Sequence, residues 1–125
     1  MDNNLVVKLA FEFSLAIIDF CEILEQQKKF VISKQLLRAA TSIDANIVEA
    51  QNAESKADFI HKFKIGAKEG EETEYWLLLC DFSPNYPDCK ELLLKIETLN
   101  KIIGKIISTS KQKHPINHLL SLFLF

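Results

Sequence analysis

The sequence predicts an all-α protein, an antiparallel four-helix bundle with up-down-up-down connectivity. Apolar residues recur at spacings of three and four along four segments, and no strand pattern of comparable strength occurs. Glycine and proline are scarce, with three of each among 125 residues, which favours long regular elements. Short links between consecutive helices favour antiparallel neighbours. We expect residues 1–113 to form one bundle domain and residues 114–125 to form an apolar tail.

The first helix is expected over residues 5–27. Its polar residues fall within a narrow arc of the helix surface, and almost all the others are apolar. The polar residues are Lys8, Glu12, Asp19, Glu22 and Gln26. A surface helix of a monomeric bundle needs an apolar arc of only about 100°. The excess apolar surface must therefore contact the rest of the chain or another copy of the protein.

The second helix is expected over residues 34–51, with Ser33 as its N-cap after a link at 28–32. One side carries small and aliphatic residues: Leu36, Ala40, Ile43, Ile47 and Ala50. A polar strip lies roughly opposite: Arg38, Ser42, Asn46 and Glu49. This strip is either a solvent-facing side or part of a polar network with the third helix. In the network the partners would be Lys68, Glu69, Glu72 and Tyr75.

The third helix is expected over residues 56–81. Ser55, followed three residues later by Asp58, resembles a capping box. Its buried side is the series Phe59, Phe63, Gly66, Gly70, Thr73 and Leu77. Each interior glycine costs a helix about 1 kcal/mol relative to alanine. We therefore expect another backbone to approach closely at Gly66 and Gly70.

The fourth helix is expected over residues 89–110, after a turn at 83–88 that contains two prolines. Its buried side is the series Leu92, Ile96, Leu99, Ile103 and Ile106. The tail beyond it is rich in large apolar residues: Leu119, Leu120, Leu122, Phe123, Leu124 and Phe125. They are too few to cross a bilayer, which takes about 20 residues. We expect them to dock on the bundle or on a neighbouring chain, the alternative being a frayed end.

Composition limits the partners and the compartment. A net charge of −2 and a pI near 5.9 argue against the basic face that nucleic-acid binding normally needs. Three cysteines without a CxxC pair, and an N-terminus unlike a secretory signal, predict buried thiols in a reducing cytoplasm. One local cluster of basic residues is nevertheless a candidate contact for nucleic acid. The alternative is that its side chains are only exposed to solvent and balance acidic neighbours. The cluster consists of Lys28, Lys29, Lys34 and Arg38.

The motifs that would carry catalysis are missing from the sequence. It contains no GxSxG, no phosphate-binding glycine loop and no Glu-x-x-His pair of the di-iron bundles. His114 and His118 have the spacing of a zinc pair but lack a third and fourth ligand. We therefore expect no enzymatic activity, no cofactor, no metal and no small-molecule substrate. We also expect no membrane association, because charged residues interrupt the apolar runs well before the roughly 20 residues of a membrane-spanning helix.

Two segments carry a resemblance to a known family. Residues 37–50, LRAATSIDANIVEA, resemble a motif of the four-helix bundle proteins encoded within 23S rRNA intervening sequences. Residues 55–59, SKADF, and 68–77, KEGEETEYWL, are similar to a second motif of that bacterial family. The resemblance extends over about residues 5–107. It departs from the family at Asp44, where proline is frequent, and at Ala50, where glycine is frequent.

The resemblance implies an antiparallel four-helix bundle that assembles as a ring, typically a homopentamer, with no established biochemical activity. A relative similar in fold, the accessory variability determinant of diversity-generating retroelements, binds a reverse transcriptase and nucleic acid through a basic surface. We expect a cytoplasmic, non-enzymatic, homo-oligomeric interaction protein. The alternative is an accessory factor whose ring adds up lysines from several subunits to bind RNA, DNA or a reverse transcriptase.

Overall fold

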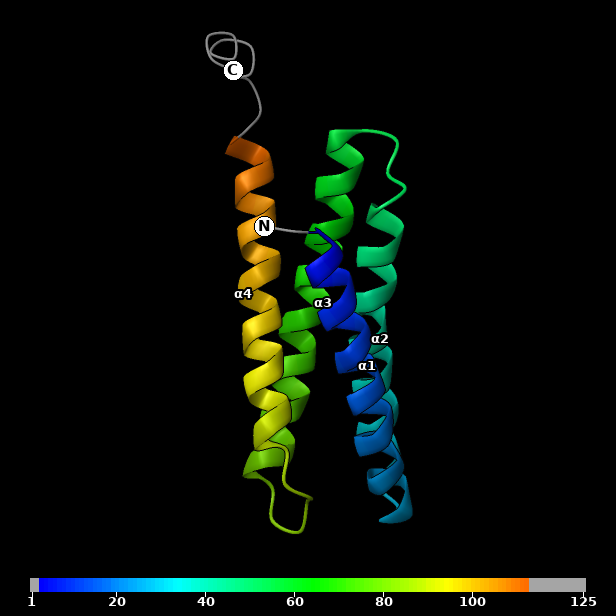
Figure 1. The fold of residues 1–125 in the computed structure, drawn as a ribbon. Helices are drawn as coiled ribbons and strands as arrows, with labels where there is room; N and C mark the ends of the chain where they lie inside the picture. The colour runs from blue at the N-terminus through cyan, green and yellow to red at the C-terminus, as the bar shows by residue number, and fades with distance from the viewer. Residues whose placement is uncertain (1–2, 113–125) are drawn as a thin grey trace, which may run out of the picture.

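The computed structural model describes residues 3–112, which form four helices (Figure 1). They are α1 (Asn3–Gln26), α2 (Phe30–Ala50), α3 (Lys56–Phe82) and α4 (Lys90–Gln112). No strand occurs in this part of the chain. The prediction of an all-α four-helix protein is therefore confirmed. The apolar tail and the His114/His118 pair lie outside the described residues.

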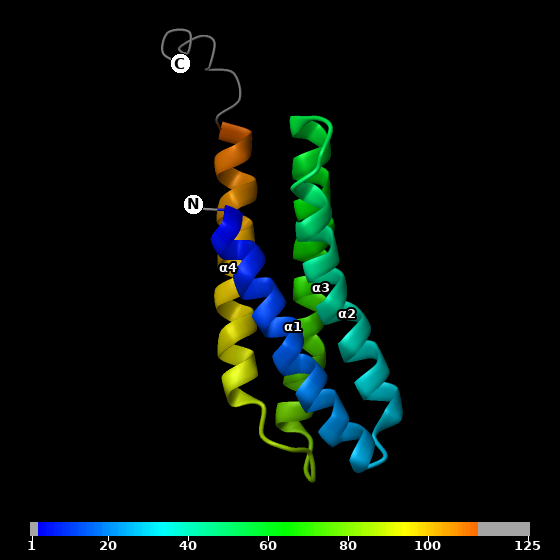
Figure 2. The ribbon, with the colours of Figure 1, turned by 45° about the vertical axis from the view of Figure 1, so that its right-hand side comes forward.

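Consecutive helices run in opposite directions and lie side by side (Figure 1). α1 packs against α2 and α4, and α3 packs against the same two helices. α1 leans across the bundle: its N-terminal half lies beside α4, and its C-terminal end lies beside the start of α2 (Figure 2). From its middle toward its C-terminus, α1 therefore diverges from α4 (Figure 2).

The core lies along the inner sides of the four helices. The series predicted on α2 and α4 are buried throughout, and on α3 the series is buried from Phe63 to Leu77. Phe59, the first member on α3, is only half-buried and packs beside Phe63, with ring centroids 4.7 Å apart. The spacings of three and four thus identified the buried sides correctly.

The second helix begins four residues earlier than predicted, at Phe30. The chain makes this sharp reversal through Lys28, whose φ of 64° lies in the left-handed region. Lys29 N–H donates to the Leu24 carbonyl (2.8 Å) and Lys28 N–H donates to that of Glu25 (2.9 Å). These two bonds form a Schellman motif, which satisfies the last carbonyls of α1. The link is therefore Gln27–Lys29 instead of residues 28–32.

Ser33 is buried inside α2 and is not the N-cap, which is Lys29 without a side-chain bond. The Ser33 hydroxyl lies 3.2 Å from the Cys21 carbonyl and 3.3 Å from Glu25 Oε2, both on α1, and its single proton can be donated to either of them. In return, the Cys21 thiol donates to the Ser33 carbonyl at 3.4 Å. Ser33 therefore holds α1 and α2 together at their shared end.

The N-cap predicted for the third helix is confirmed. Ser55 has an extended backbone, and its hydroxyl accepts a hydrogen bond from the Asp58 N–H at 3.0 Å. Asp58 accepts in return from the N–H of Glu54, one residue before the cap (3.3 Å). The capping arrangement is therefore shifted by one residue from the reciprocal bond of a capping box.

Candidate functional site

Arg38 of α2 connects to two carboxylates of α3. Its guanidinium lies 3.3 Å from Glu69 and also contacts Glu72. Glu72 accepts a second hydrogen bond from the indole N–H of Trp76 at 3.0 Å. Because the Arg38 side chain is 48% exposed, we expect these ion pairs to add at most about 1 kcal/mol. They place charged groups of α2 and α3 in a defined register.

The other members of the predicted polar strip have separate partners. Asn46 donates to the backbone oxygen of Ser42 at 2.8 Å, within α2. Glu49 is paired with Lys62 of α3 at 3.1 Å, a partner that sequence reasoning did not name. Lys68 and Tyr75 are exposed, and neither makes a side-chain hydrogen bond with the described residues. The strip thus divides into local pairs.

Asn100 of α4 is a polar contact that sequence reasoning missed. Its Nδ2 donates to the backbone oxygen of Gly70 (3.2 Å) and to Glu74 (3.3 Å). A Cβ atom on Gly70 would lie 2.1 Å from Asn100 Oδ1. Gly70 therefore accommodates a side chain of α4, and the expectation of a close backbone there was wrong. At Gly66 an added Cβ would meet the Ile43 carbonyl at an ordinary 3.8 Å, so no unusually close backbone lies there either.

The sequence signal for Asn100 was its position between Leu99 and Ile103, two members of the apolar series of α4. It follows the buried Leu99 directly and is itself half-buried. A polar side chain at such a position needs a partner, because a buried unpaired group is costly. A search for small residues on the facing helix would have suggested Gly70.

α1 carries an outer stripe of exposed apolar residues, which we define as Phe11, Leu15 and Ile18. They are 55%, 49% and 38% exposed. Their spacings of four and three place them along one line of the helix. The half-buried Val7 extends this line by one turn. The chain's own helices therefore leave part of the wide apolar arc of α1 uncovered.

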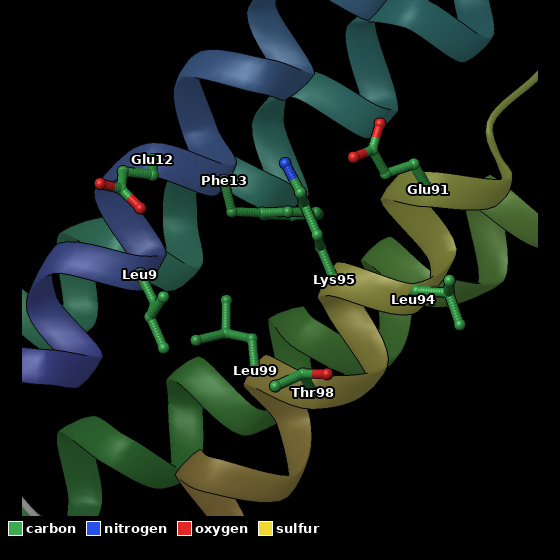
Figure 3. A pocket seen from close by; sticks show the side chains of 8 residues that line it. All are labelled: Leu9, Glu12, Phe13, Glu91, Leu94, Lys95, Thr98 and Leu99. Carbon is green, nitrogen blue, oxygen red and sulfur yellow. The ribbon is translucent and has the colours of Figure 1, made fainter.

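A groove of about 320 Å³ opens where α1 and α4 diverge (Figure 3). We call it the α1–α4 groove. It is lined by Leu9, Glu12, Phe13, Glu91, Leu94, Lys95, Thr98 and Leu99. Leu9 and Leu99 point toward one another across it (Figure 3). The lining is mostly apolar, with charged groups contributed by both helices.

The predicted basic cluster lies partly around a second hollow, of about 360 Å³, at the end of the bundle where α1 meets α2. We call it the loop-end hollow. It is lined by Lys28, Lys29, Phe30, Val31, Ile32, Trp76 and Tyr86. The Lys29 ammonium lies 4.7 Å from the centre of the Tyr86 ring, a cation–π contact. Lys34 is exposed on α2, and Arg38 is paired with acidic residues.

The three thiols are buried, as predicted. Burial raises the pKa of Cys80 to about 12 and that of Cys89 to about 11, and it also raises the pKa of Cys21. Thiols with such pKa values remain protonated at neutral pH and are poor nucleophiles. Among residues 3–112, no three His, Cys, Asp or Glu side chains are grouped to hold a metal ion. None of the four helices combines the length and apolar character needed to cross a bilayer.

Comparisons with known proteins agree with this architecture. The model of the family described as 23S rRNA-intervening sequence protein matches residues 2–106. A crystal structure of a protein of unknown function, from the S23 ribosomal protein family of Bacteroides thetaiotaomicron, is 40% identical to this chain. The match covers 86% of this chain and 99% of that one, with a TM-score of 0.82. A search of curated proteins found no match.

Proposed function

Because this chain belongs to the 23S rRNA-intervening sequence protein family, we propose that it is a non-enzymatic interaction protein that assembles as a ring of identical subunits. The ring would contain five chains, as the family resemblance implies, and would act in the cytoplasm as a scaffold. The observation that carries this proposal is the exposure of the outer stripe of α1.

The outer stripe of α1 suits contact with a second copy. Scattered apolar residues are normal on protein surfaces, but aligned ones mark interaction sites. Phe11, Leu15 and Ile18 follow one line, and Val48 of α2 adds another exposed apolar side chain. Because these side chains are already about half covered, burying the rest of each against a neighbour would contribute about half of the 1.5–3 kcal/mol that full burial is worth. Interfaces in a ring are built from such patches repeated by symmetry.

The chemistry of the thiols supports a non-enzymatic role. Cys80 and Cys89 are buried with pKa values near 12 and 11, so they are unsuited to nucleophilic catalysis. The acidic residues that face Arg38 are engaged in ion pairs, and they form no pair of free carboxylates in a cleft. The polar groups of α2 and α3 are thus better suited to fixing the packing of these helices.

Light scattering coupled to gel filtration tests the assembly. At micromolar concentration we expect a mass close to five times the 14.3 kDa of one chain. Leu15→Glu, which adds a charge to the outer stripe, should shift the protein toward monomers. Leu78→Glu, at a comparably exposed apolar residue of α3, serves as the matched control and should keep the wild-type mass. A strictly monomeric wild-type particle would refute the proposal.

The loop-end hollow favours a second candidate, a nucleic-acid-binding accessory factor that acts as a ring or with a reverse transcriptase. The hollow combines Lys28 and Lys29 with the aromatic rings of Trp76 and Tyr86. Aromatic surfaces that stack on bases, beside cations for the phosphates, are typical of single-strand binding. Repetition around a ring would multiply the positive charge, even though one chain has a net charge of −2.

Binding of single-stranded RNA and DNA at low salt tests this candidate. Affinity should fall steeply as salt is added, because counterions are released on binding. Replacement of Lys28 and Lys29 by alanine should weaken binding, whereas replacement of the exposed Lys101 and Lys105 should not. Undetectable binding of the wild-type protein at low salt would eliminate the candidate.

A further inference from the structure

The α1–α4 groove has the size and the surface of a site for large apolar side chains. Its apolar lining residues are Leu9, Phe13, Leu94 and Leu99. Phe13 and Leu99 are buried at its floor, so the accessible apolar surface comes from the half-buried Leu9 and from Leu94, which is 64% exposed. Its volume of about 320 Å³ is roughly ten times the 30 Å³ share of a water molecule in the liquid. The described residues leave this groove open.

We propose that residues 119–125 of the same chain dock in the α1–α4 groove. Six of these seven residues are leucine or phenylalanine, and none is charged. Burial against an apolar surface is the favourable state for such a segment, because exposure to water is unfavourable in proportion to apolar area. The groove offers that surface on the same helix from which the segment extends.

The length of the chain matches the distance that must be spanned. From Gln112 to the level of Leu99 on α4 there are 13 residues, or about 20 Å of helix. Residues 113–118, when extended, span about 20 Å and would bring Leu119 to that level. Pro115 cannot continue α4, so the chain is expected to leave the helix axis there.

The groove is also matched in length to the apolar segment. Its lining on α4 extends from Glu91 to Leu99, about 12 Å along the helix. Seven residues in a helical conformation occupy about 10 Å. Side chains from one face of the segment would therefore enter the groove, while the opposite face stays outside it.

Charge and position favour this occupant over a second copy. Glu12 and Glu91 contribute negative charge beside Lys95 at the groove. Of the basic residues in the segment that leads to the tail, His118 is the one that the spans above bring to the level of Leu99, where the groove begins. The outer stripe of α1 lies on the other flank of that helix from Leu9 and Phe13, since each residue advances about 100°. A second copy can therefore occupy the stripe while the tail occupies the groove.

Hydrogen exchange of the full chain, measured by mass spectrometry on peptides covering residues 116–125, tests the proposal. We expect backbone amides of the wild-type tail to exchange at least about tenfold more slowly than an unstructured chain. Leu94→Glu, at an exposed residue that the fold does not need, should abolish this protection. Leu78→Glu, on the exposed side of α3, should leave it unchanged. Unprotected wild-type amides, or protection that survives Leu94→Glu, would overturn the proposal.

A mixing experiment separates the chain's own groove from that of a neighbour. Full-length wild-type chains are refolded with an excess of Leu94→Glu chains that lack residues 113–125, so that the neighbouring grooves are disrupted. Docking within one chain predicts that the wild-type tail stays protected in the mixture. Loss of protection would show that the tail binds a neighbouring copy and would overturn same-chain docking. The light-scattering mass of Leu94→Glu should equal that of wild type. A failure of tail docking, seen in hydrogen exchange, is therefore distinguishable from a failure of ring assembly, seen in the mass.

Discussion

Asn100 donates from Nδ2 to the Gly70 backbone oxygen and to Glu74, so one side chain of α4 contacts two residues of α3. Its Oδ1 is buried without a partner among the described residues and lies against the Cα of Gly70, where any side chain would collide with it. At the scale of single residues, this pair sets how closely α3 and α4 approach.

Gly70→Ala should fail to stabilise the protein although alanine favours helices by about 1 kcal/mol. The new methyl group would displace Asn100 and break its hydrogen bonds, each worth about 0.5–1.5 kcal/mol. Gly104→Ala is the matched control: nothing lies within 4 Å of its added Cβ, so it should stabilise by about 0.5–1 kcal/mol. Urea unfolding should place Gly70→Ala about 1–2 kcal/mol below Gly104→Ala.

If the collision with Asn100 is what makes Gly70→Ala unfavourable, Gly70→Ala should stabilise the protein once the Asn100 side chain is removed. In an Asn100→Ala background, Gly70→Ala should recover the stabilisation seen at Gly104. If the effect of Gly70→Ala is unchanged in that background, the contact with Asn100 does not explain the glycine.

Asp44 should make the protein less stable as the pH rises. Its Oδ1 is buried without a partner in residues 3–112, and burial raises its pKa above the usual 3.8. The folded state therefore holds this proton more tightly than the unfolded state does. Stability is lost as the pH rises from the unfolded pKa through the folded one.

Asp44→Asn removes this charge and keeps a similar shape. The advantage of the variant over wild type in unfolding free energy should grow between pH 3 and pH 7, as measured by urea unfolding at each pH. Wild-type and variant curves that differ by a constant amount would contradict the assignment.

At the scale of the helix, the ends decide where each element begins and stops. α3 starts at a serine cap, whereas α1 stops because Lys28 takes a left-handed backbone conformation. Glycine is the residue that adopts this conformation without strain, and a lysine there is strained. The bonds from Lys28 and Lys29 back to α1 keep the reversal in place.

Lys28→Gly should therefore stabilise the protein by about 0.5–1 kcal/mol, as the relief of strain exceeds the added freedom of the unfolded chain. Lys28→Ala keeps the Cβ atom and should give no gain, so it is the matched control. Thermal unfolding of both variants checks this, and equal melting temperatures would show that the backbone at residue 28 is not strained.

At the scale of the whole molecule, α1 and α4 make the smallest of the four helix–helix contacts. α1 leans from α4 toward α2, which opens the α1–α4 groove on one flank and leaves the outer stripe exposed on the other (Figures 2 and 3). The two surfaces offer separate sites for the tail and for a second copy.

If copies assemble through the outer stripe, thermal stability should depend on concentration. Association with a folded partner stabilises by mass action, so the melting temperature of the wild type should rise by a few degrees for each tenfold increase in protein. In Leu15→Glu the dependence should disappear. Differential scanning fluorimetry over three decades of concentration measures both, and a constant wild-type melting temperature would oppose assembly.

The sequence by itself determined the four helices and their buried sides, because apolar spacing of three and four depends only on the helical repeat. It also located the Ser55 cap, a local signal within four residues. It misplaced the start of α2, since Ser33 has the residue type of a cap but finds its partners on α1. Only the tertiary structure decided that Gly70 accommodates Asn100, that Glu49 pairs with Lys62, and that α1 diverges from α4. Those features depend on how helices distant in the chain lean against one another, and spacing along a single helix carries no information about that.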